Sequence, residues 1–203
     1  MTHKNQQRKI ALVVEKLAAN KRFHEITLEQ VARAAKVGKG TIYRYFKDKD
    51  DLFFQVATSG FEQLCELIEK NIPQQMPFPE KLLNTCGQIS RFFAARRQLM
   101  IMMQTLATRI HRSKGPLRRQ WMDKRKKLVN IVEQILSTGV NEGVIRTDIP
   151  LEVLANFLLA MLRANARDLR NYSTPANRHK VLVDLFLKGA GANSSMNREG
   201  DTE

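Results

Sequence analysis

Between Lys39 and Tyr45 the chain carries the side chains with the clearest capacity for chemistry. Ile42 and Phe46 are four residues apart and share the buried face of a short predicted helix. The positions left on the outer face are Lys39, Thr41, Tyr43, Arg44 and Tyr45. Cations, hydroxyls and aromatic rings on one exposed face suit contacts with phosphates and base edges. The segment therefore predicts a surface that binds nucleic acid.

A second helix is predicted immediately before this segment. Thr27 followed three residues later by Gln30 is a capping box, which marks a helix start. An apolar stripe with helical spacing follows, made of Leu28, Val31, Ala32 and Ala35. The stripe stops at Lys36, so a tight turn joins the two helices. Residues 27–49 are thus predicted to form a basic helix-turn-helix.

The sequence from Val31 to Leu52 resembles the DNA-binding signature of the TetR family of bacterial transcriptional regulators. The matching pattern is V-x-x-A-A-x-V-G-K-G-T-I-Y-R-Y-F-K-x-K-x-x-L. The resemblance implies that the helix starting near Lys39 enters the major groove of DNA. It further implies phosphate contacts from Thr27, Tyr43, Tyr45 and Lys49, and an approach to bases by Lys39, Gly40, Thr41 and Arg44.

Two positions depart from the family pattern. The family often has Gly where this chain has Lys36, and often Ser where it has Gly38. A non-glycine residue in a left-handed helix cap costs about 1 kcal/mol. Either Lys36 tolerates this cost and gains a phosphate contact, or the turn differs in shape.

Positive charge is concentrated in two blocks of the sequence. The 203 residues include 34 Lys and Arg against 20 Asp and Glu, a net charge of +14. Residues 1–50 hold 12 basic and 5 acidic side chains, and residues 91–127 hold 12 basic and 1 acidic. The first block coincides with the helix-turn-helix, which favours a polyanionic partner. The second has three interpretations: a solvated helix face, a further DNA contact, or a basic mouth for an anionic ligand.

The apolar periodicity predicts an all-α protein in three parts. Residues 1–50 form a three-helix DNA-binding head, residues 51–190 a helical ligand-binding and dimerisation body, and residues 191–203 a disordered tail. The family resemblance implies a dimer that binds palindromic operator DNA, most often as a repressor. The stretch from Val153 to Leu162 is apolar nearly all round, which predicts burial on two faces. The expected dimer interface is Leu154, Leu158, Leu162, Leu182, Leu185 and Phe186.

An effector pocket is expected among the helices between residues 51 and 141. Methionine clustering at Met100, Met102 and Met103 favours an adaptable apolar cavity. Because Arg96, Arg97, Arg109 and Arg112 are close by in sequence, an amphipathic or anionic small molecule such as an acyl thioester is one candidate. The candidate lining residues are Phe61, Leu64, Phe92, Phe93, Met100, Met103, Trp121 and Leu128.

Several other functions find no support in the sequence. The four histidines have no metal-ligand spacing, and no phosphate loop or catalytic triad can be placed, so neither an enzyme, a metal site nor a cofactor is expected. Cys65 and Cys86 are interpreted as buried thiols, and we expect a cytoplasmic protein that does not enter membranes. The alternative to a ligand-responsive regulator is an effector-free DNA-binding protein, controlled by a protein partner or acting architecturally.

Overall fold

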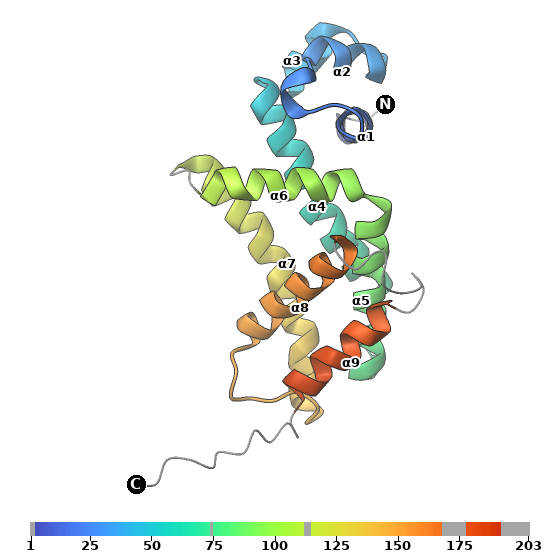
Figure 1. Cartoon of the computed structure of the whole chain (residues 1–203), viewed down its shortest axis with the longest axis vertical. Helices are drawn as coiled ribbons and strands as arrows, with labels where there is room; N and C mark the ends of the chain where they lie inside the picture. Colours follow the sequence, from blue (N-terminus) through green and yellow to red (C-terminus); the bar gives the residue numbers. More distant parts are fainter. Residues whose placement is uncertain (1–2, 74, 112–114, 168–177, 192–203) are drawn as a thin grey trace. The chain divides into compact units, whose positions relative to one another are not determined.

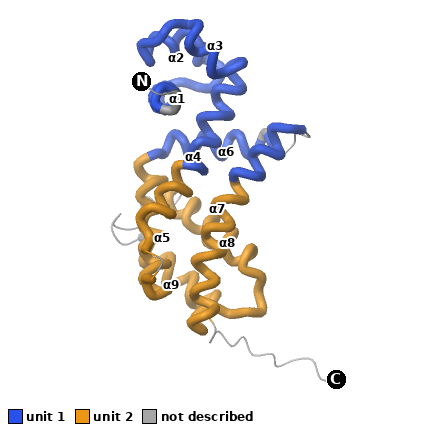
Figure 2. Tube along the Cα trace, turned by 180° about the vertical axis from the view of Figure 1, so that it is seen from behind, with its two compact units in different colours: residues 1–62, 96–124 blue, residues 63–95, 125–203 orange. Residues whose placement is uncertain are grey.

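The computed structural model describes residues 3–73, 75–111, 115–167 and 178–191. Regular structure in these ranges is helical apart from a single antiparallel bridge between Ile145 and Gly191, which confirms the all-α class. Packing divides the chain into two compact units, shown in different colours in Figure 2: residues 1–62 with 96–124, and residues 63–95 with 125–203. The functional division at residue 50 stays a prediction. The expected tail lies outside the described residues except for Gly191.

The first unit begins with the three-helix head that the sequence predicts. Its helices are α1 (His3–Ala18), α2 (Leu28–Ala35) and α3 (Lys39–Tyr45), with a short 3-10 turn η1 (Phe23–Glu25) after α1 (Figure 1). The side chains that close the head are almost fully buried, so hydrophobic burial holds the three short helices together. They are Ile10, Val14, Ile26, Val31, Ile42 and Phe46.

Three further helices contribute to the first unit: α4 (Lys49–Asn71), α6 (Arg97–His111) and the beginning of α7 (Pro116–Asn141). Gly60 allows α4 and α6 to approach closely, because a Cβ atom there would lie 2.8 Å from the Met103 sulfur. Phe61 packs edge-on against Trp121, with ring centroids 4.8 Å apart. These contacts join α4 to both other helices.

An ion pair connects α1 with the residue that precedes α6. The Arg96 guanidinium donates from Nε to Glu15 Oε2 at 2.8 Å, and its Nη2 binds the other carboxylate oxygen. Both side chains are largely buried, with 19% and 9% of the surface of Arg96 and Glu15 exposed. Arg96 is therefore committed to α1, which removes it from the arginines expected to meet an effector.

The second unit contains α5 (Phe78–Ala95), the remainder of α7, α8 (Leu151–Arg167) and α9 (Arg178–Ala190), together with the end of α4. A glycine just past a helix end is a common stop signal, and α7 ends before Gly143, whose φ of 70° is left-handed. The Phe78 N–H donates to the Glu142 carboxylate at 3.1 Å and so ties the start of α5 to the end of α7. The core of this unit includes Leu82, Ile89, Leu136, Leu158 and Leu162.

The sequence Asp148-Ile149-Pro150 predicts Asp148 as the N-cap of α8, with Pro150 just inside the helix, and the structure differs. The carbonyl of Pro150 accepts from the Leu154 N–H at 3.2 Å, so Pro150 itself precedes the first helical residue. Both carboxylate oxygens of Asp148 instead accept from Arg146, each at 2.6 Å. A bidentate guanidinium is a stronger partner than a single backbone N–H, which explains the difference.

Two helical glycines in the second unit provide a matched test of this packing. A Cβ atom at Gly139 would lie 2.6 Å from the buried Phe78 ring, whereas nothing lies within 4 Å of a Cβ atom at Gly189. We expect Gly139→Ala to lower the free energy of unfolding by about 1–3 kcal/mol through overpacking. Gly189→Ala should raise it by about 0.5–1 kcal/mol through helix propensity. Urea unfolding of both variants measures the two effects, and an unchanged midpoint for Gly139→Ala would contradict the close packing.

Candidate nucleic-acid interface

The helix-turn-helix starts at the predicted capping box. The Gln30 N–H donates to Thr27 Oγ1 at 3.2 Å, and the Thr27 N–H donates to Gln30 Oε1 at 3.4 Å. Thr27 is exposed, and the four apolar residues of α2 are buried as expected. Satisfied backbone donors and one buried face explain why this eight-residue segment is helical.

The turn between α2 and α3 is left-handed at Lys36. Lys36 has φ 54° and ψ 49°, and among the residues that the structure describes it is the single non-glycine residue with positive φ. Its N–H donates to the Arg33 carbonyl at 3.1 Å, and the Val37 N–H donates to the Ala32 carbonyl at 3.0 Å. The turn thus has the conformation that the family often gives to glycine, and the exposed Lys36 side chain stays a predicted phosphate contact.

The outer face of α3 presents most of the side chains expected to bind DNA. Ile42 is 0% exposed and Phe46 is 2% exposed, so these two residues anchor the helix from its inner side. Exposed on the other side are Lys39, Gly40, Tyr43 and Arg44, whereas Thr41, Tyr45 and Lys49 are half-buried. Burial of the anchors fixes the orientation of the candidate DNA-binding face before any ligand arrives.

Interactions that the sequence did not predict position two of the cations. Lys39 Nζ lies 2.6 Å from Glu29 Oε1, and this hydrogen bond lowers the pKa of Glu29 and raises the pKa of Lys39. Arg44 Nη2 donates to the Tyr45 hydroxyl at 3.3 Å, and that hydroxyl donates to Gln6 Oε1 at 3.2 Å. Glu29 and Gln6 therefore adjust the face without belonging to α3.

The comparisons with known proteins agree with this geometry. Residues 15–56 match the family model of bacterial regulatory proteins of the tetR family. The fatty acid metabolism regulator protein of Bacillus subtilis is 26% identical over 153 residues, 75% of this chain and 77% of that protein. The HTH-type transcriptional repressor AcnR of Corynebacterium glutamicum is 26% identical over 140 residues, 69% of each chain.

Two solved structures show the same fold. The fatty acid degradation regulator FadR from Bacillus halodurans has a TM-score of 0.78 at 19% identity, covering 93% of this chain and 98% of that one. FadR from Bacillus subtilis, in complex with stearoyl-CoA, has a TM-score of 0.75 at 21% identity, covering 90% and 98%. The chain is a TetR-family regulator. It is a DNA-binding transcriptional regulator and not an enzyme, while the role of each residue of its DNA-binding face stays a prediction.

The expected effector-pocket residues of this TetR-family regulator are divided between the two compact units. Phe61, Met100, Met103 and Trp121 belong to the first unit, and Leu64, Phe92, Phe93 and Leu128 belong to the second. All are buried except Phe92, which is half-buried. Sequence reasoning also missed Gln88 on α5: its Oε1 atom is buried and has no hydrogen-bond partner among the described residues. Gln88 lies one turn before Phe92 on α5, so it adds a polar acceptor to the candidate lining residues of the second unit.

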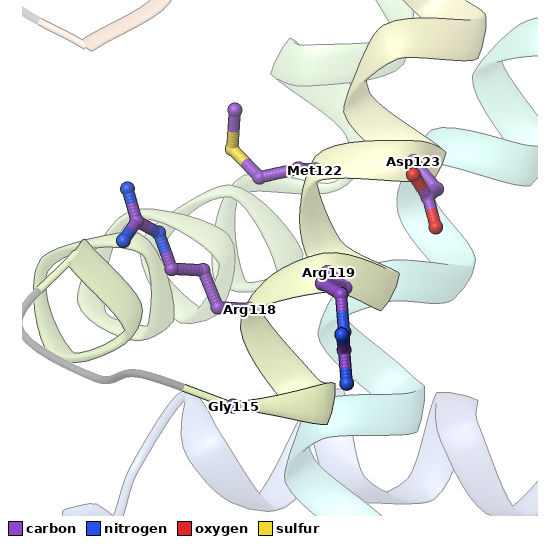
Figure 3. A pocket seen from close by; sticks show the side chains of 5 residues that line it. All are labelled: Gly115, Arg118, Arg119, Met122 and Asp123. Carbon is purple, nitrogen blue, oxygen red and sulfur yellow. The ribbon is translucent and has the colours of Figure 1, made fainter.

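The second basic block is partly neutralised by α4. Lys124 Nζ lies 2.7 Å from Glu62, and Lys127 Nζ lies 3.9 Å from Glu69. At the start of α7 the block borders an open surface hollow of about 580 Å³ (Figure 3). Arg118 and Met122 extend to the same side of α7 there, away from Asp123. The hollow is lined by Gly115, Arg118, Arg119, Met122 and Asp123.

Burial narrows the expected dimer interface. Five of its six residues are at most 5% exposed within their own chain, so a partner subunit cannot cover much of their surface; they are Leu154, Leu158, Leu162, Leu182 and Phe186. Leu185 is 58% exposed. The other large apolar side chains exposed on α8 and α9 are Val153, Phe157 and Val181. The helices remain the predicted interface, with the contact moved to their exposed faces.

Base and phosphate contacts on α3 can be separated by mutation. We expect Arg44→Ala and Lys39→Ala to relax base preference, because a base contact contributes about 1–3 kcal/mol of discrimination. Lys49→Ala should weaken binding to all sequences alike, since phosphates carry no sequence information. Binding-site selection followed by fluorescence anisotropy measures both effects. An unchanged preferred site in both the Arg44 and Lys39 variants would remove these residues from the base-reading set.

Proposed function

We propose that this regulator is a homodimeric repressor that binds a palindromic operator and is released by an amphipathic acyl thioester. The observation that carries the DNA-binding part is the basic face of α3, held outward by the buried Ile42 and Phe46. Two such faces related by a two-fold axis would meet successive major grooves about one helical turn apart, or a multiple of it. An operator read in this way has inverted half-sites.

The exposed apolar side chains of α8 and α9 support dimerisation. Phe157 and Leu185 are 64% and 58% exposed, although both lie on helices whose opposite faces form the core of their unit. Val153 and Val181 lie one turn before them on the same two faces. Large apolar side chains exposed on two helices that pack together commonly mark a protein interface. A second copy of the chain is the occupant that a two-fold operator requires.

The similarity to fatty-acid regulators supports the class of effector. The solved Bacillus subtilis FadR is in complex with stearoyl-CoA, and that fold is shared over 90% of this chain. A long acyl chain needs an apolar lining with few polar groups. Within the second unit, the buried Leu64, Phe93 and Leu128 fit this requirement, and the unpaired Gln88 Oε1 offers an acceptor for a polar hydrogen.

The Glu15–Arg96 pair supplies a route for the response within the first unit. Arg96 immediately precedes α6, and α6 carries Met100 and Met103 of the predicted lining. A ligand that shifts α6 would therefore act on α1 through this pair, and α1 packs against α2 of the helix-turn-helix. Release requires that the ligand bind the DNA-free conformation more tightly, by about 1–3 kcal/mol for a typical allosteric coupling.

Operator release is tested with the operator found by site selection. Stearoyl-CoA should weaken operator affinity about 5- to 150-fold, the range for a coupling of 1–3 kcal/mol. Coenzyme A alone should have a smaller effect because it lacks the acyl chain. Fluorescence anisotropy with and without each compound gives the ratio. If no acyl thioester changes operator affinity, the effector-free interpretation is favoured.

The dimer surface is tested by exposed substitutions. Phe157→Glu and Leu185→Glu should shift the chain toward monomer, because each buries an unpaired charge in the proposed interface. Leu117→Glu on α7, which is 47% exposed outside that surface, is the control and should leave the assembly unchanged. Sedimentation equilibrium reports the oligomeric state of all three. Dimers in both interface variants would place the contact on other helices.

A further inference from the structure

Two arginines in the second unit bring their positive charges together. Arg125 lies on α7 and Arg163 lies on α8. Burial lowers the pKa of Arg163 below its ordinary value, and the positive charge of Arg125 lowers it further. Like charges repel, so placing two guanidiniums near each other in a partly buried site costs free energy unless an anion binds between them.

Asn156 fixes the position of Arg125. Arg125 Nη2 donates to Asn156 Oδ1, and the Asn156 Nδ2 group donates to the Glu152 carbonyl at 2.8 Å. The second bond orients the amide so that its oxygen faces Arg125. Arg163 follows Asn156 by seven residues, which is two helical turns and about 10 Å along the axis on the same side of α8. Long arginine side chains can converge on one group over such a distance.

Neither arginine has a counter-ion among the residues that the structure describes. No ion pair joins Arg125 or Arg163 to a described carboxylate, although neighbouring lysines on α7 pair with Glu62 and Glu69. Both arginines are half-buried, so each keeps part of its surface open to solvent. A half-buried arginine pair, one member of which is oriented by Asn156, is suited to a planar or tetrahedral oxyanion, which accepts paired N–H donors.

We propose that Arg125 and Arg163, with Asn156 as the positioning residue, bind the oxyanion group of a small amphipathic effector. This inference rests on the proposed function, because it assigns the acidic head of that effector to the second unit. Apolar side chains pack beside the pair: Leu128 lies one turn after Arg125, and Leu159 lies one turn before Arg163, and both are buried. The oxyanion is either a phosphate group, as in coenzyme A thioesters, or the carboxylate of a fatty acid.

Titration calorimetry of the full chain with three probes distinguishes the two sources. Coenzyme A carries phosphates without an acyl chain, stearate carries a carboxylate, and stearoyl-CoA carries phosphates with the chain. Arg125→Gln and Arg163→Gln should each lower the affinity for the probe that carries the bound oxyanion about 10- to 100-fold. This is the loss expected for one charge-assisted contact. Lys126→Gln changes the same charge at an exposed position next to Arg125 and should leave every affinity within about twofold.

Thermal unfolding without any probe separates the site from damage to the fold. Removing an uncompensated charge should raise the melting temperature of Arg163→Gln above that of the parent. Arg163→Lys is the second variant. It keeps the positive charge but loses the paired N–H donors of the guanidinium, so it should also lower the affinity for the probe. Operator affinity in the absence of effector should match the parent in every variant, which keeps this test independent of DNA binding.

Three results would overturn the inference. The first is parental affinity for all probes in both arginine variants. The second is binding of none of the probes by the parent. The third is a monomer for Arg163→Gln with unchanged probe binding, which would identify the missing counter-ion as a carboxylate of a second subunit. If the probes bind through the arginines and yet do not release the operator, the oxyanion site stands and the proposed mode of release fails.

Discussion

The ion pair between Glu15 and Arg96 is the interaction on which the arrangement of the first unit depends. It joins positions 81 residues apart, and both side chains are largely shielded from water. Removing one partner would leave the other as a buried charge, at a typical cost of about 3–5 kcal/mol. The pair therefore fixes α1 against Arg96, the residue that precedes α6. Because Ile10 and Val14 of α1 belong to the core of the head, the support of α3 depends on the same contact.

The left-handed turn at Lys36 is a second constraint, and it acts against local stability. A lysine in this conformation costs about 1 kcal/mol relative to glycine, but the turn keeps its backbone hydrogen bonds to α2. The buried anchors Ile42 and Phe46 then hold α3 in place despite its length of seven residues. The strain is tolerated because tertiary burial, rather than helix propensity, stabilises so short a helix.

Local sequence rules predicted the head well because its decisive features are close in sequence. The capping box at Thr27, the apolar stripe of α2 and the anchors of α3 each depend on residues within one or two turns. Contacts between distant residues were not predictable in this way. Nothing in the spacing indicates that Glu15 meets Arg96 or that Glu29 holds Lys39.

The dimer residues show a related limit of periodicity. A helix that is apolar all round has two faces to bury, but its sequence does not say which face its own chain uses. The structure places Leu154, Leu158 and Leu162 in the core and leaves Phe157 exposed, so the stripe that looked most regular is internal. Exposed side chains such as Phe157 are therefore the ones that can contact a partner subunit.

The same reasoning explains why the basic block of residues 91–127 has no single role. Its members differ in what their neighbours supply: Glu15 neutralises Arg96, Glu62 neutralises Lys124, and Glu69 lies near Lys127. Arg125 instead donates to the amide oxygen of Asn156, and its charge contributes, after burial, to lowering the pKa of Arg163 on another helix. Net charge along the sequence cannot separate these cases, because it counts charges without their partners. A cation that the fold buries beside another cation is the one for which an external anion gives the largest gain in electrostatic free energy.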